Sequence, residues 1–239
     1  NTVKNLVKAT GIGVHTGDVV TMTLRPAAAN TGIVFRRVDL DIPVEIEAKP
    51  EYIGETTLST CLVKDGVRVS TVEHLMSALA GLGIDNLYVD LDSCEVPIMD
   101  GSASPFVFLL KSAGIESQNA AKKFLKIKQD VVIESQDKLM KLSPYNGFKI
   151  NFSIDFNHPC FDEKNQFMTI DFSDSSYTHE VARARTFGFI ADYEMIKKNN
   201  LAKGSSFDNA VVFDDYRVMN EGGLRYTEEP LRHKVLDVI

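Results

Sequence analysis

The sequence predicts an α+β fold made of two halves with similar organisation. Each half opens with segments in which every second residue is apolar, as in half-buried strands; the clearest are Val20-x-Met22-x-Leu24 and Ile150-x-Phe152-x-Ile154-x-Phe156. Each half then continues into stretches with helical apolar periodicity. Strands followed by helices, twice along a chain of 239 residues, are typical of two α+β units. A hydrophobic content of 44% is enough to bury a substantial core.

In the first half we expect strands over residues 3–12, 19–25, 31–35 and 44–46. A hairpin should pair residues 58–63 with 68–70 around the turn Asp65-Gly66. A helix follows, then a strand over 86–91. Ser104 is expected to cap a second helix, with Pro105 at its first position and an end near Gly114.

The short polar stretch 118–123 marks the predicted domain boundary, so residues 1–122 form an N-terminal α+β domain and residues 123–239 a C-terminal one. Strands are expected over 124–127, 131–134, 138–142, 148–156 and 167–172, with a further β-rich segment at 210–213. Helices are expected over 192–199 and from residue 229 onward. The helical spacing of apolar residues continues to the last residues of the chain without a capping residue, and the chain has no initiating Met. We therefore expect a fragment that lacks a C-terminal part.

Composition excludes several classes of protein. The net charge is −7 and no basic run is present, which argues against a nucleic-acid partner. No apolar run approaches the ~20 residues that a membrane span needs, and the N-terminus is too polar for a signal peptide. Cys61, Cys94 and Cys160 are scattered, which favours a reducing cytoplasm and argues against a zinc site made of cysteines.

The helix expected around residues 70–83 carries a candidate metal site. Its apolar residues form one stripe, with Ser70 or Thr71 as the expected cap, and His74 lies off that stripe beside small residues. Glu73 precedes His74 directly, and a carboxylate next to an imidazole is what a metal site needs. Ser70-x-x-Glu73 also matches a capping box, in which Glu73 would only bind a main-chain N–H, so both interpretations stay open.

The helix that starts near Glu229 offers a second pair. His233 and Asp237 are four residues apart and therefore share a face, opposite the apolar stripe. Alone, such a pair is equally compatible with a solvent-exposed face. Together the helices provide two imidazoles and a carboxylate, the protein ligands of a catalytic zinc with an open position for water. Glu73 would be the general base, and Lys234 would stabilise the developing oxyanion.

Five separated motifs, in order, carry a family resemblance: Ser70-Thr71-Val72-Glu73-His74-Leu75, Gly81-Leu82-Gly83-Ile84-Asp85-Asn86, Pro97-Ile98-Met99-Asp100-Gly101-Ser102, Arg183-Ala184-Arg185-Thr186-Phe187-Gly188-Phe189 and His233-Lys234-x-x-Asp237. With them the chain resembles the UDP-3-O-acyl-N-acetylglucosamine deacetylases, zinc enzymes of lipid A synthesis in Gram-negative bacteria. The resemblance runs from Gly11 to Ile239. It implies two packed α+β domains with the active site between them, a cytoplasmic enzyme, and hydrolysis of an N-acetyl group to acetate and a free amine.

The resemblance also implies roles for residues. The zinc ligands fall on His74, His233 and Asp237, and the general base falls on Glu73. Two imidazoles and a carboxylate suit Fe²⁺ as well as Zn²⁺. A general-acid histidine of the family would lie beyond Ile239. Other matches are Thr186, which polarises the substrate carbonyl, Lys234 beside the metal, Phe156, which stacks on uracil, and Lys138, Phe187 and Phe189, which bind substrate.

The expected partner is thus a UDP-sugar that carries an acyl chain, with hydroxamate-type inhibitors and a monomeric state also expected. Two alternatives remain at this point. One is a zinc hydrolase that acts on another amide, and the other is a metal-free binding module whose His and Asp residues are exposed on the surface without a metal-binding role.

Overall fold

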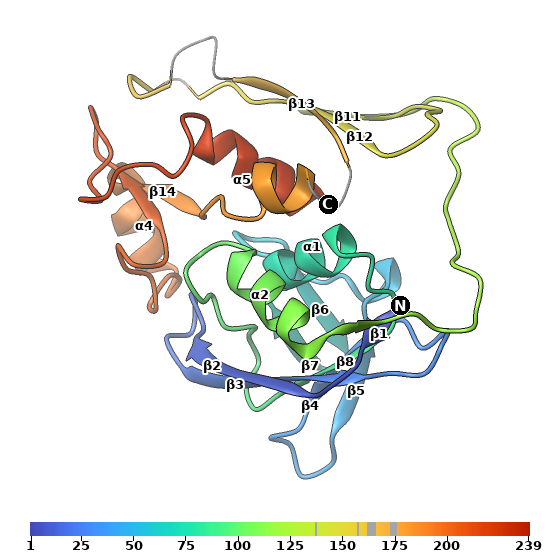
Figure 1. Cartoon of the computed structure of the whole chain (residues 1–239). Coiled ribbons are helices and arrows are strands. Elements are labelled where there is room, and N and C mark those ends of the chain that lie inside the picture. The colour runs from blue at the N-terminus through green and yellow to red at the C-terminus, as the bar shows by residue number, and fades with distance from the viewer. Residues whose placement is uncertain (137, 157, 162–165, 173–175) are drawn as a thin grey trace.

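The computed structural model describes residues 1–136, 138–156, 158–161, 166–172 and 176–239, and its mixture of sheets and helices confirms the α+β class. Its elements are stacked in layers (Figure 1): a five-stranded sheet, then α1 and α2, then α5, with β12 and β13 beyond α5. The helices α1 (Glu73–Gly81), α2 (Ser104–Ala113) and α5 (Glu229–Val238) therefore lie in the middle of the stack. The short helix α4 (Tyr193–Lys198) lies to one side.

The five-stranded sheet confirms the predicted strands of the first half, except that the strand expected over 3–12 is interrupted: Val3 belongs to the short strand β1 (Thr2–Val3), and β2 begins at Val7. Its order is β2 (Val7–Ile12), β3 (Val19–Pro26), β8 (Leu87–Leu91), β4 (Ile33–Arg37) and β5 (Val44–Glu47), with all pairs antiparallel except β8–β4. Along β8, Leu87, Val89 and Leu91 are buried, while Tyr88 and Asp90 face the other way and are less buried. This alternation is the period of two that a sheet covered on one face requires.

The remaining strands form small pairs. They are β1 (Thr2–Val3) with β9 (Ile115–Glu116), the predicted hairpin β6 (Cys61–Lys64) with β7 (Val67–Ser70), β10 (Val131–Ser135) with β11 (Lys138–Leu142), β12 (Lys149–Ser153) with β13 (Phe167–Asp171), and β14 (Phe187–Phe189) with β15 (Val211–Phe213), the last pair parallel. Single turns of helix occur at Pro50–Tyr52, Tyr177–Val181 and Ile190–Asp192, the second of them a π-helix.

The contact between α1 and α5 joins the two halves. Leu75 and Leu79 of α1 and Val235 and Leu236 of α5 are all buried in one hydrophobic cluster. On its other side α5 packs against β12 and β13, as Figure 1 shows. Burial of these apolar faces supplies the main driving force that holds the helices together.

The predicted start of α1 was wrong. The helix begins at Glu73, and the residue before it, Val72, makes no side-chain cap. The hydroxyl of Ser70 instead donates to the main-chain oxygen of Cys94, and that of Thr71 donates to Glu95. Thr71 also has a φ of 58°, which a β-branched residue rarely adopts. The hydroxyls of Ser70 and Thr71 therefore bind residues that are distant in the sequence, and they do not cap the helix.

Other expectations also differ from the structure. Ser104 was expected to cap α2, but it is the first residue of the helix, and the residue before it, Ala103, makes no side-chain cap. Residues 124–127 form no strand, and Phe124 and Leu125 are exposed, since no described strand lies alongside to accept their main-chain hydrogen bonds. The small residue Gly81 of α1 has a structural role, because the ring of Tyr177 lies where a Cβ at this position would overlap it, and the Tyr177 hydroxyl is 3.1 Å from that of Ser77.

The predicted boundary at residues 122 and 123 falls in the stretch between β9 and β10. Whether the two halves are independent domains stays a prediction. Within the described ranges, no helix combines the length and the apolar character needed to cross a bilayer.

Candidate metal centre

Helices α1 and α5 bring His74, His233 and Asp237 together. One potential ligand atom from each residue lies within 4.8 Å of the others. Nε2 of His74 is 3.9 Å and Nε2 of His233 is 3.5 Å from Oδ1 of Asp237. The two imidazoles meet edge to face, with ring centroids 4.9 Å apart. Both histidines are buried, so the interpretation of an exposed His/Asp pair on a solvent face is wrong.

The hydrogen bond of His233 fixes which of its nitrogens carries the proton. Nδ1 lies 3.0 Å from the main-chain oxygen of Ala184, and a carbonyl oxygen only accepts, so Nδ1 is the donor. In the neutral ring Nε2 then holds a free lone pair, and this lone pair lies beside Oδ1 of Asp237. Two electron-pair donors thus face each other in a buried place. A cation between them would convert their repulsion into attraction, so the donor set fits a metal ion.

The charge states agree with this fit. Burial and the neighbouring His233 lower the pKa of His74 to about 3. Burial likewise lowers the pKa of His233. Both rings are therefore neutral near pH 7, the form that binds metals. Burial acts to raise the pKa of the Asp237 carboxyl, but the neighbouring imidazoles and the Lys234 ammonium outweigh it, so that this pKa lies below its usual value and the group is a carboxylate.

The carboxyl of Glu73 lies at the first position of α1, next to His74. It accepts a hydrogen bond from the main-chain N–H of Thr60, not from that of Ser70, which donates to Cys94 instead. The capping-box interpretation is therefore wrong. Burial raises the pKa of Glu73 above its usual value, although the Thr60 N–H acts in the opposite direction. A raised pKa makes this carboxylate a stronger base near neutral pH.

Lys234 and Thr186 lie beside the cluster. Nζ of Lys234 donates to Oδ2 of Asp237 at 3.1 Å. The main chain of Thr186 is held on both sides, because its N–H donates to Gly101 at 2.7 Å and its oxygen accepts from Val211 at 2.8 Å. Among the described residues the Thr186 hydroxyl has no hydrogen-bond partner, which leaves it free to bind another group.

A cluster of aromatic side chains extends from the candidate metal ligands. The ring of Phe187 lies 6.3 Å from that of His233 and 5.5 Å from that of Phe156, measured between centroids. Phe156 and Phe189 line a cavity of about 240 Å³ together with His158, Ala191, Asp192, Phe213, Asp214 and Asp215. Lys138, at the start of β11, is exposed and does not line this cavity.

Sequence reasoning missed several residues that shape the site. Thr60 acts through its main chain, which no side-chain pattern reveals. Glu95 and Glu229 are fully buried carboxylates. Glu95 binds the N–H groups of His15 and Thr16 and the hydroxyl of Thr71. A charged residue within an apolar stretch, Cys94-Glu95-Val96, was the signal that could have revealed Glu95.

A buried cluster of two histidines and an aspartate, beside a glutamate of raised pKa and between two α+β halves, is the arrangement expected of a metal-assisted hydrolase. Comparison with known proteins is more specific. The whole chain, residues 1–239, matches the family described as LpxC, UDP-3-O-acyl N-acetylglycosamine deacetylase, and it belongs to that family. The resemblance drawn from the five motifs is confirmed.

Relatives with the name UDP-3-O-acyl-N-acetylglucosamine deacetylase agree with this assignment. The protein of Coxiella burnetii (strain RSA 493 / Nine Mile phase I) is 64% identical over 238 residues. The proteins of Nitrosococcus oceani and Methylococcus capsulatus are 61% and 58% identical over the same length. Each comparison covers 100% of this chain and 78% of the relative. The chain thus belongs to a family of deacetylases, in agreement with the enzyme class expected from the sequence.

Removal of one ligand should remove the metal. We expect His74→Ala and Asp237→Ala to lower zinc affinity by more than the ~10–100-fold that loss of an outer partner costs. The fold should persist, since neither change opens the shared apolar core. Metal analysis and circular dichroism of the same preparations measure both effects. Asp90→Asn, on the outer face of the five-stranded sheet, is the control, and full zinc occupancy in both ligand variants would contradict the assignment.

Proposed function

We propose that this protein hydrolyses the N-acetyl group of a UDP-3-O-acyl-N-acetylglucosamine, giving acetate and a free glucosamine amine, and that it does so with a bound metal ion. This is the reaction named in its relatives. We place it in the cytoplasm, as an early step of lipid A biosynthesis in Gram-negative bacteria. The observation that carries the proposal is the lone pair of His233 Nε2 beside the Asp237 carboxylate, a pairing that favours a cation.

In this proposal His74, His233 and Asp237 hold the ion. Zinc suits two neutral imidazoles and one carboxylate, and Fe²⁺ suits them as well. The ion, when bound, polarises the amide carbonyl and lowers the pKa of the attacking water. The hydrogen bond between Nδ1 of His233 and Ala184 supports this role, because it fixes the ring tautomer that leaves Nε2 free for a metal.

Glu73 removes the proton from the water as it attacks the carbonyl carbon. Its raised pKa and its position next to His74 support this role. As the carbonyl oxygen gains negative charge, the free hydroxyl of Thr186 donates a hydrogen bond and the Lys234 ammonium stabilises the charge. The rigid main chain around Thr186 favours such a donor, since it need not reorganise during the reaction. We assign no residue of this chain to the protonation of the leaving amine.

The nucleotide end of the substrate would occupy the cavity beside Phe156. A uracil ring stacks on an aromatic side chain such as Phe156 or Phe189, as bases do on aromatic platforms in other proteins. Asp192, Asp214 and Asp215 also line this cavity. Carboxylates accept the N–H and O–H donors of uridine but repel phosphate, so the diphosphate would leave the cavity toward Phe187 and the metal ligands. Lys138 remains a proposed contact of the nucleotide.

The function is tested by metal removal. We expect a strong chelator to abolish deacetylation of the UDP-sugar and added zinc to restore it, with UDP acting as a competitive inhibitor. Acetate release measures the rate. Activity that persists in fully metal-free protein would overturn the metal-dependent mechanism, whereas activity that UDP does not inhibit would point to a different amide substrate.

Loss of the aromatic platform should weaken nucleotide binding. Phe156→Ala is expected to raise the Kd for UDP about 5- to 150-fold, because stacking of a base on an aromatic side chain contributes ~1–3 kcal/mol. Isothermal titration with UDP measures the change. Phe148→Ala removes an equally large ring that stacks on Phe172, outside the cavity lining, and should leave the Kd unchanged. If Phe156→Ala binds UDP with the same Kd as Phe148→Ala, the nucleotide does not stack on Phe156.

A carboxamide at position 73 separates base catalysis from metal binding. Glu73→Gln keeps the shape of the side chain and its acceptor for the Thr60 N–H, but it cannot take a proton from water. We expect kcat to fall at least ~100-fold while zinc content, UDP affinity and Tm stay close to those of the parent protein. Rate, metal content and melting are measured on one preparation. Near-normal turnover would exclude Glu73 as the base.

A further inference from the structure

A buried ion pair lies next to the proposed metal ligands. Glu229, in the first turn of α5, is 0% exposed. Its Oε1 accepts hydrogen bonds from the main-chain N–H of Arg185 at 2.9 Å and from Nε of the Arg185 side chain at 2.8 Å. Its Oε2 accepts from Nη2 of Arg185 at 3.0 Å and from the N–H of Arg225 at 2.6 Å. The guanidinium of Arg185 also donates to the main-chain oxygen of Gly223 at 2.8 Å, so neither charge lacks partners.

Glu229 and His233 form hydrogen bonds with two consecutive residues of the chain, Arg185 and Ala184. Glu229 and His233 are four residues apart and lie on one face of α5. Glu229 binds Arg185, while Nδ1 of His233 binds the oxygen of Ala184. The next residue is Thr186, whose N–H reaches Gly101 in the first half. The segment 184–186 is therefore fixed to α5 at two adjacent points, and it carries both the hydrogen-bond partner of the His233 ring and the Thr186 hydroxyl.

Stability alone does not account for such a pair. Two buried charges gain little net free energy over well-packed apolar side chains, because desolvation offsets much of their attraction. Such a pair instead fixes the orientation of its two side chains, because the forked guanidinium and the carboxylate form their two parallel hydrogen bonds in one geometry only. Arg225 extends the arrangement, since its guanidinium lies 2.9 Å from the Asp100 carboxylate in the loop that holds Gly101.

We propose that Glu229 and Arg185 are positioning residues, which hold Ala184 and Thr186 against α5 and thereby fix the imidazole orientation of His233 and the place of the Thr186 hydroxyl. The inference rests on the proposed function, because it assumes that His233 binds the metal and that Thr186 acts on the substrate. Neither Glu229 nor Arg185 contacts a proposed ligand atom, and their effect passes through the main chain.

The test uses conservative variants and two readouts. Glu229→Gln removes the negative charge but keeps an acceptor, and Arg185→Lys keeps the positive charge but removes the fork. We expect each variant to weaken zinc binding about tenfold or more, measured by competition with a chromophoric chelator, and to lower kcat with little change in KM. The zinc titration does not depend on activity, so it reports the orientation of His233 directly.

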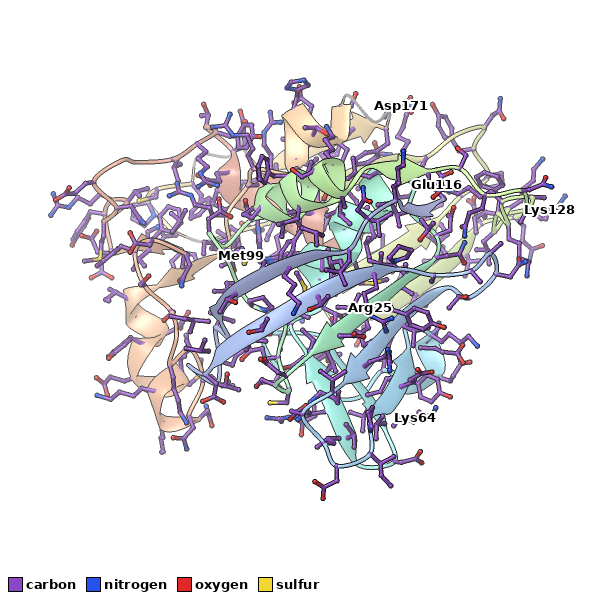
Figure 2. All side chains as sticks on the ribbon, turned by 60° about the horizontal axis from the view of Figure 1, so that its bottom comes forward. Arg25, Lys64, Met99, Glu116, Lys128 and Asp171 are labelled. Carbon is purple, nitrogen blue, oxygen red and sulfur yellow. The ribbon has the colours of Figure 1, made fainter. Side chains whose placement is uncertain are left out.

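A matched control exists on the outer face of the five-stranded sheet. Arg25, labelled in Figure 2, donates through Nε and Nη2 to the two oxygens of Asp90 at 2.7 and 3.1 Å. Asp90→Asn therefore breaks a pair of the same geometry away from α5. We expect it to leave zinc affinity and kcat at the parent values, whatever it does to Tm.

The outcomes are distinct. Folded Glu229→Gln and Arg185→Lys proteins with parental zinc affinity and kcat would overturn the positioning role, and if Glu229→Gln does not fold, Arg185→Lys alone decides. His233→Ala in the same titration tests the underlying assumption. If it keeps parental zinc affinity, the proposed metal centre fails; if it loses zinc while the positioning variants do not, only the positioning inference fails.

Discussion

The packing of α1 against α5 is the contact on which the rest of this structure depends. Each helix contributes its own apolar residues to one core, and each carries part of the same polar cluster at the edge of that contact. Neither helix alone carries all three candidate metal ligands. The imidazoles of His74 and His233 become buried only when the two helices pack together. The same packing therefore brings the rings close to each other and lowers their pKa values. In this arrangement the formation of the core and the assembly of the site are the same process.

Two buried carboxylates secure the segments that lead into these helices. Glu95 holds the turn around His15 and Thr16 and the residue Thr71, which has a strained main chain just before α1. Glu229 holds Arg185 and the first turn of α5. Strained main-chain conformations persist only where surrounding contacts enforce them, and here the enforcing groups are buried acceptors with several donors each. Rigid surroundings of this kind favour precise placement of the groups between them.

The sequence predicted the strands well where apolar alternation was strong, as in β3, β8 and β12, and it predicted the hairpin around Asp65-Gly66 from turn chemistry. It failed where local and long-range preferences compete. Ser70-x-x-Glu73 is a capping box by spacing, yet each of its side chains has a partner from elsewhere in the chain, Cys94 for Ser70 and Thr60 for Glu73. Residues 124–127 contain three apolar side chains, Phe124, Leu125 and Ile127, but no described strand pairs with them.

The sequence by itself determined the fold class, the family and the candidate ligands, because periodicity, residue type and motif spacing are properties of the chain alone. The i, i+4 spacing of His233 and Asp237 places them on one face of any helix. Only the tertiary structure decided that His74 lies beside them, that the pKa of Glu73 is raised, and that His233 carries its proton on Nδ1. These properties depend on contacts between residues that are distant in the sequence, 49 residues apart for His233 and Ala184, and on the removal of water around them. They exist only after the chain has packed.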